Sequence, residues 1–281
     1  MAAAMRVRVV GSSASVPRPG RACSCHLIRA RGTNLLLDMG TGALANLRIV
    51  MDYPDLDGIV ITHMHADHFL DLIPLRYGLK YGPLLRDDRM PIWLPPGGEG
   101  QLRAFAATFS SEGPSDFLDE VFEVHEYDPA KTLEIGRLTV TFAKTIHYID
   151  AYAVRVERDG ASVCYSSDTA PCERVEELAR GSSIFLCEAA LGLSVETGPM
   201  RGHLSAVEAG EMAQRAGARR LVLTHYGTEF APGELEDAAR SVYHGPCAIA
   251  DDGTELPISR RCAAPPLCPP ELVEGWSPLS P

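Results

Sequence analysis

The order of apolar and polar positions predicts a mixed α/β protein. Residues 5–11 alternate charged and branched side chains, which is typical of a strand with one exposed face. Residues 56–61 and 184–188 contain apolar runs that indicate buried strands. Residues 69–81 and 206–216 carry apolar side chains at helical spacing. Strands and helices are therefore expected to alternate along the chain.

Turn residues and helix signals set the bounds of the expected elements. Strands are expected at residues 5–11, 27–31, 34–38, 56–61, 90–94, 121–127, 138–143, 151–156, 162–166, 184–188, 220–224 and 247–250. Helices are expected at residues 43–51, 69–81, 97–109, 171–180, 206–216 and 232–243. Residues 31–33 are the expected turn of a hairpin, and the polar residues 109–119 are expected to form a lid or a surface loop.

Length and composition favour one catalytic domain. The chain has 281 residues, of which 46% are hydrophobic, so it can bury a substantial core. We expect this domain to span residues 5–258. Residues 261–281 contain many prolines and few core-forming side chains, so we expect a disordered tail there.

The charge is acidic, with 37 Asp and Glu against 26 Lys and Arg and a formal net charge of -11. Without a Lys/Arg-rich run, this argues against nucleic acid held mainly through its phosphates, although a local basic patch would still allow it. No apolar stretch approaches the length of a membrane span. Arg6 and Arg8 interrupt the first apolar segment, so we expect no signal peptide and no membrane partner.

The eight cysteines show no framework of a small secreted protein. Cys164 and Cys187 lie in strand-like apolar runs, and Cys23 and Cys25 are too close together for the usual zinc-binding pair. We therefore expect reduced thiols and a cytoplasmic protein.

The segment Thr62-His63-Met64-His65-Ala66-Asp67-His68 indicates a metal site, because it brings three imidazoles and one carboxylate to the end of an apolar strand. On a strand-to-helix turn, His63 and His65 can reach one ion while Asp67 and His68 turn toward a second. Neutral imidazole and carboxylate are ligands that suit zinc and its first-row neighbours. The alternative is a polar turn with three unrelated histidines.

Three further residues follow apolar strands in the same way. They are His147, Asp168 and His225. Loops at one edge of a sheet would gather such side chains. One of them alone would more often be an ordinary turn residue, but four loops that each supply His or Asp point to a common site.

This order and spacing resembles the metallo-β-lactamase superfamily over about residues 5–258. The resemblance implies a four-layer αββα sandwich with two metals between the upper edges of two sheets. It implies two Zn²⁺ ions, with Mn²⁺ or Fe²⁺ left open. The implied ligands are His63, His65 and His147 for one ion, Asp67, His68 and His225 for the other, and Asp168 as the bridge.

The segment Gly202-His203-Leu204-Ser205-Ala206 and the strand before His225 resemble the ribonuclease Z-type phosphodiesterase branch. Within it, residues 166–169 and 185–189 look most like the atypical class II-like cyclic-nucleotide phosphodiesterases of bacteria. In that branch a histidine at the place of His203 assists phosphate chemistry. The alternative for His203 is a helix-capping role.

The expected function is hydrolysis of small or cyclic phosphodiesters by a hydroxide held between two metals. Asp67 would bind metal and steer the nucleophile, and His203 would stabilise the transition state or protonate the leaving alkoxide. Glu188 would orient His203 or serve the fold, and Asp38 would orient a ligand histidine or be a turn residue. Tyr148 and Tyr226 would stack on a base or line the wall.

Substrate contacts are expected from loops such as residues 82–88 and 109–119. A tRNA 3′-processing nuclease would share the catalytic residues, but the acidic charge and the lack of a long Gly/Pro/Lys-rich insertion argue against it. A lactonase or β-lactamase would not need His203, and a bridging Asp168 departs from the β-lactamase pattern. A zinc-stabilised binding module would need a closed four-ligand site. We expect a homodimer.

Overall fold

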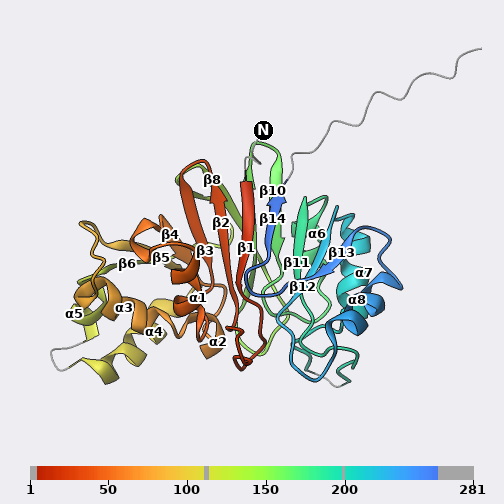
Figure 1. Ribbon diagram of the computed structural model, residues 1–281, viewed down its shortest axis with the longest axis horizontal. Helices are drawn as coiled ribbons and strands as arrows, with labels where there is room; N and C mark the ends of the chain where they lie inside the picture. The colour runs from red at the N-terminus through yellow and green to blue at the C-terminus, as the bar shows by residue number, and fades with distance from the viewer. Residues whose placement is uncertain (1–4, 111–113, 198–199, 259–281) are drawn as a thin grey trace, which may run out of the picture.

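Two sheets stand face to face in the computed structural model, which describes residues 5–110, 114–197 and 200–258. Each is a seven-stranded mixed sheet, and helices cover the outer face of each (Figure 1). The layers therefore follow the order α, β, β, α. This is the αββα sandwich of the metallo-β-lactamase fold, so the predicted fold class is confirmed.

The first sheet has the strand order β14-β1-β2-β3-β4-β5-β6. Its strands are β1 (Met5–Gly11), β2 (Cys25–Ala30), β3 (Thr33–Leu37), β4 (Gly58–Val60), β5 (Met90–Leu94), β6 (Phe122–Glu126) and β14 (Glu255–Ile258). The helices on this side of the molecule are α1 (Ala43–Val50), α2 (Ala66–Phe69), α3 (Leu72–Tyr81), α4 (Gly98–Ala106) and α5 (Pro114–Asp119), with short 3-10 helices at Tyr53–Asp55 and Ala107–Phe109.

The second sheet has the strand order β13-β12-β11-β10-β9-β8-β7. Its strands are β7 (Leu133–Ile135), β8 (Leu138–Lys144), β9 (Tyr152–Arg158), β10 (Ala161–Tyr165), β11 (Ile184–Glu188), β12 (Leu221–Thr224) and β13 (Cys247–Ile249). Its helices are α6 (Glu173–Ala179), α7 (Ala206–Ala216) and α8 (Pro232–Arg240). In the part of the chain that the structure describes, no helix has both the length and the apolar composition to cross a membrane.

The core consists of three apolar layers, because the inner strands are buried on both faces. In β3, Leu35 and Leu37 point into the layer between the sheets while Leu36 packs under the helices of the first sheet. In β11, Leu186 lies between the sheets and Phe185 packs under α6 and α7. This explains why these strands are continuous apolar runs in the sequence.

Four differences from the predicted elements have local causes. The short strand β7 and the edge strand β14 were not predicted, because half-exposed strands of three or four residues give little periodic signal. Residues 109–119 are not only loop, since α5 lies within them and buries Phe117 and Leu118. The helix expected at 69–81 begins earlier, as α2 and then α3. The predicted tail at 261–281 lies outside the described residues.

We predict that the layer between the sheets carries much of the stability. Leu186→Ala should lower the free energy of unfolding by about 2–5 kcal/mol, because Leu186 is fully buried. The matched control, Ile49→Ala on α1, should change it by no more than about 0.5 kcal/mol, since Ile49 is 81% exposed. Urea denaturation of both metal-free variants measures this. Equal losses would contradict the assignment of the core.

Candidate metal centre

The ends of four strands place the predicted site residues. Strands β8, β10 and β12 run in the same direction, because β9 is antiparallel to both β8 and β10, and β10, β11 and β12 are parallel. His147, Asp168 and His225 follow the ends of β8, β10 and β12, so they gather at one edge of the second sheet. The first sheet contributes the segment after β4.

That segment divides its ligand-type side chains between a loop and a helix. His63 and His65 lie on the loop, while Asp67 and His68 lie in the first turn of α2. A side chain at Gly40 would overlap the backbone of Asp67, so glycine lets the end of β3 approach the start of α2 closely.

Asp38 holds this segment in place from the end of β3. Its carboxylate accepts hydrogen bonds from the Thr62 amide at 2.7 Å, the Thr62 hydroxyl at 2.9 Å and His68 Nδ1 at 2.7 Å. The last contact turns His68 Nε2 toward the centre of the site. Of the two predicted alternatives for Asp38, the structure therefore supports the orienting role.

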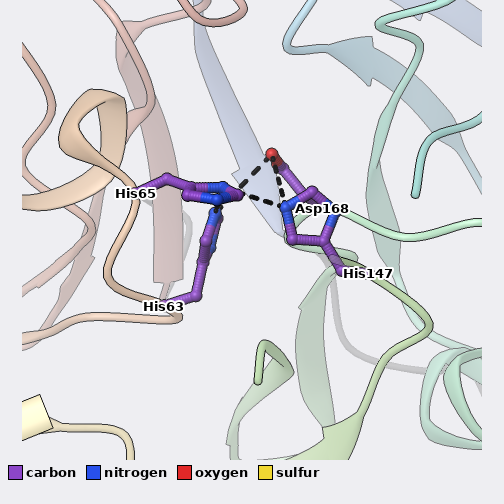
Figure 2. A group of neighbouring side chains, drawn as sticks. All are labelled: His63, His65, His147 and Asp168. Atoms are coloured by element: carbon purple, nitrogen blue, oxygen red, sulfur yellow. Dashed lines mark hydrogen bonds and ion pairs between the residues drawn. The ribbon is translucent and has the colours of Figure 1, made fainter. Parts of the chain in front are cut away.

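Four donor groups converge in a first cluster, made of His63, His65, His147 and Asp168 (Figure 2). His65 Nδ1 lies 3.2 Å from His63 Nε2 and 3.0 Å from His147 Nε2. His147 Nδ1 donates to the Gly202 carbonyl, so its Nε2 presents a lone pair. Nitrogen ligands of a tetrahedral zinc ion lie about 3.3 Å apart, so this spacing suits a metal.

A second cluster contains Asp67, His68, Asp168 and His225, with one donor atom from each within 4.8 Å of the others. Asp168 Oδ1 lies 3.3 Å from His68 Nε2, and Asp168 Oδ2 lies 3.3 Å from His225 Nε2. In the described part of the chain, Asp168 Oδ1, His68 Nε2 and His225 Nε2 are buried without a hydrogen-bond partner. Buried polar atoms are rarely left unpaired, so this donor set fits a cation between them.

The charges of the site are interdependent. Burial alone would raise the pKa of Asp168, but the neighbouring His225 and His68 hold it well below its usual range. Burial alone would lower the pKa of His68, but Asp168 and Asp38 raise it well above its usual range. Burial lowers the pKa of His63. A cation at His68 Nε2 would take the place of the proton, as metal binding generally does at imidazole.

His203 lies beside the two clusters rather than inside them. Its Nδ1 donates to Glu188 Oε1 at 3.0 Å and lies 4.0 Å from Asp168 Oδ2. Ser205, with its capping box to Glu208, caps α7, so the alternative role of His203 as the helix cap is wrong. Glu188 serves both predicted roles, because it also accepts the amides of Thr169, Ala190 and Leu204.

Tyr148 and Tyr226, each next to a histidine of the clusters, differ in their burial and contacts. Tyr226 is buried, and the guanidinium of Arg18 covers its ring at 4.2 Å, so it lines the wall and cannot stack on a base. Tyr148 is 44% exposed and donates to Glu196. Its ring centre lies 5.7 Å from that of His203, at the rim of the site.

The backbone is strained where it delivers these side chains. Asp38, Ser167 and His225 have φ values of 59°, 52° and 50°, in the left-handed region. Each lies just beyond a strand, and such conformations cost about 1–3 kcal/mol for a residue with a side chain. The surrounding hydrogen bonds, including that between His225 Nδ1 and Ser24 Oγ at 2.8 Å, hold them in place.

A pocket of about 400 Å³ opens next to His203. It is lined by residues 14–19, 190–191 and 227–229 together with His203. Residues 82–88 and the described part of 109–119, expected to contact a substrate, do not line this pocket. The sequence did not predict that residues 14–19 line the site, because their Gly/Ser/Pro composition indicates a loop but not which residues it contacts.

The comparisons with known proteins agree with this geometry. The family described as beta-lactamase superfamily domain matches residues 33–226. The chain is also 33% identical over 256 residues to the protein Rv1339 of Mycobacterium tuberculosis, covering 90% of this chain and 92% of that protein. The chain therefore belongs to the beta-lactamase superfamily, whose fold and clustered His and Asp side chains define a class of metallo-hydrolases.

Two further comparisons, one with a curated protein and one with a solved structure, agree with this family. A ribonuclease Z of Mycobacterium bovis is 28% identical over 278 residues, covering 92% of this chain and 99% of that protein. The crystal structure of the metallo-beta-lactamase fold protein YhfI from Bacillus subtilis superposes with a TM-score of 0.80 at 25% identity, over 90% of this chain and 98% of that chain. The predicted resemblance to the superfamily and to ribonuclease Z is confirmed.

We predict that His203 is protonated at neutral pH in the metal-free protein. Burial alone would lower its pKa, but the hydrogen bond to Glu188 and the charge of that carboxylate raise it to about 9. Because the folded-state pKa is raised, the associated stability is full below the ordinary value of 6.5 and is lost as pH rises through about 9.

Histidine NMR titration of the metal-free protein measures this. Glu188→Gln should move the His203 pKa down. An unchanged His203 pKa in the variant would show that Glu188 is not the cause.

Proposed function

We propose that this protein is a two-metal phosphodiesterase that acts on small or cyclic phosphodiesters, with cyclic nucleotides as the leading class. The observation that carries the proposal is the placement of His203. It is held by Glu188 beside both donor clusters and lines the adjacent pocket, although it is not a member of either cluster. Hydrolysis of a lactone or a β-lactam would not need such a group.

The proposed ligands follow the two clusters. His63, His65 and His147 would hold one ion, Asp67, His68 and His225 the other, and Asp168 would contact both. The two carboxylate oxygens of Asp168 support its bridging role, since Oδ1 faces His68 and Oδ2 lies 3.3 Å from His225 and 3.7 Å from His63. Zn²⁺ suits these ligands, and Mn²⁺ or Fe²⁺ would also accept them.

Two divalent cations bound by these residues would supply Lewis acidity and would lower the pKa of a water molecule toward neutrality. Asp67 Oδ2 accepts the Ser15 amide at 2.9 Å and lies 3.5 Å from His68 Nε2, and the Asp67 carboxylate would accept a hydrogen bond from the attacking water and orient it. His203 Nδ1 is fixed on Glu188, so Nε2 would stabilise charge on the phosphoryl group or protonate the leaving alkoxide.

The alternative function is tRNA 3′ processing, which the ribonuclease Z relative favours. That reaction would use the same side chains. The formal net charge of -11 argues against it, because an RNA substrate is held largely through its phosphates. We further propose a cytoplasmic location and a homodimer. Six cysteines of the described chain are free and buried, which agrees with a reducing compartment.

We predict that the metal-loaded protein hydrolyses phosphodiesters in preference to other esters and amides. Turnover should be measured side by side on cyclic AMP, bis(p-nitrophenyl) phosphate, precursor tRNA, a lactone and a cephalosporin. The two small phosphodiesters should give the highest kcat/KM. Preference for precursor tRNA would favour the alternative, and preference for the lactone or the cephalosporin would refute the proposal.

We also predict that His203 acts in catalysis and not in metal binding. His203→Ala should lower phosphodiester turnover by about 100- to 10,000-fold, because a general acid contributes this much. Its metal content, measured by mass spectrometry after dialysis, should stay near that of the unaltered protein. Asp168→Ala should lose metal, and His244→Ala at an exposed position should change neither quantity. Loss of metal from His203→Ala would make His203 a ligand.

A further inference from the structure

The pocket beside His203 adjoins a second pocket. The second pocket has about 420 Å³ and is lined by Arg18, Pro19, Arg21, Tyr226, Thr228, Pro232, Ile249 and Asp251. Arg18, Pro19 and Thr228 line both pockets. The two pockets therefore adjoin at Arg18, and we call them together the groove, with His203 in its first lobe and Arg21 in its second. Two adjoining pockets of this volume accommodate more than the group that is cleaved.

Arg18 is a rigid cation at the junction of the two lobes. Its Nε donates to Ser13 Oγ at 2.9 Å and its Nη2 to Ser12 Oγ at 3.0 Å, and both serines are fully buried. The Tyr226 ring covers one face of the guanidinium. These contacts fix the inner edge of Arg18 and leave Nη1, for which the described residues provide no hydrogen-bond acceptor.

The partners of Arg18 are neutral, unlike those of its neighbour. Arg21 is paired with the carboxylate of Asp251. Within the described ranges, no Asp or Glu oxygen lies within ion-pair distance of Arg18. In an acidic protein, a partly buried guanidinium without a counter-charge points to an anionic ligand, because it would gain a charge-assisted hydrogen bond there.

The position of Arg18 relative to the metal clusters is fixed by the backbone. Ser13 pairs with Tyr226, the residue after His225, and the Ser15 amide binds Asp67. The loop that carries Arg18 is thus tied to both sides of the second cluster. A group bound at Arg18 would therefore lie at a set distance from the reacting phosphate.

We propose that Arg18 binds a second phosphate group of the substrate, distinct from the one that is cleaved. This rests on the proposed phosphodiesterase function and adds that, among small phosphodiesters, those that carry a further phosphate, such as 5′-phosphorylated dinucleotides, are preferred over the same compounds without it. The guanidinium fork matches phosphate oxygens, and the lobe beyond it, with Pro232 and Ile249, has apolar surface for the attached nucleoside.

The test compares the 5′-phosphorylated dinucleotide pApA with ApA, which lacks the terminal phosphate. We expect the unaltered protein to prefer pApA by about ten- to a hundredfold in kcat/KM, as for a hydrogen bond between charged groups. In Arg18→Gln the ratio should fall close to one. Arg89→Gln, at an exposed position outside the groove, should keep the preference.

The inference is overturned if the ratio of kcat/KM for pApA to that for ApA is near one in the unaltered protein. It is also overturned if Arg18→Gln leaves this ratio unchanged. Equal use of both dinucleotides with a loss for both in Arg18→Gln would indicate stacking of a base on Arg18 instead. If Arg18→Gln does not fold, Arg18→Lys replaces it. Lysine keeps the charge but not the fork, so an intermediate ratio supports the proposal and an unchanged ratio overturns it.

A binding measurement separates this inference from the proposed function. Calorimetry with the metal-loaded protein would compare adenosine 3′,5′-bisphosphate with adenosine 5′-monophosphate. Arg18→Gln should weaken binding of the bisphosphate about tenfold or more and that of the monophosphate much less. If no phosphodiester is cleaved, the proposed function fails, but the binding comparison still tests the role of Arg18. An equal loss of affinity for both nucleotides in Arg18→Gln, or no loss for either, overturns that role.

Discussion

The structure depends on the placement of one buried negative charge. Asp168 is ionised although only 2% of it is exposed, and an unpaired carboxylate at such a depth would cost several kcal/mol. It is tolerated because donor groups from four strand ends meet around it. The fold must therefore bring those strand ends together, and it keeps strained residues such as Ser167 and His225 to do so.

The layered core supplies the rigidity that this requires. Each central strand is packed on both faces, so the strand ends cannot move independently. Asp38 and Glu188 then connect the site to this core, each accepting several hydrogen bonds while orienting one histidine. The site is therefore positioned by the sheets and oriented by two buried carboxylates.

The loops that border the site lie outside this layered core. A fold of this kind supports different substrates, because specificity comes from loops around a common centre. Here residues 14–19 and 227–229 line the groove, and residues 13–15 contact Asp67 and Tyr226, which lie in and next to the second cluster. Both loops are anchored through Tyr226, whose hydroxyl donates to Ala250.

Most of the inner site could be predicted from the sequence, because its residue types are chemically distinctive. The cluster from His63 to His68 lies within one turn, and Asp168 follows an apolar strand that any periodicity analysis finds. The groove beside His203 could not be predicted in this way. Arg18 looks like any loop arginine in the sequence, since a counter-charge, or the lack of one, depends on neighbours that are distant in the chain.

The sequence by itself determined most of the strands, the donor types and their order, since local periodicity and side-chain chemistry are properties of short segments. Only the tertiary structure decided which atoms face each other. The two groupings around Asp168 and the covering of Tyr226 by Arg18 both depend on contacts between distant segments. Such contacts follow from how the two sheets pack, which no short segment encodes.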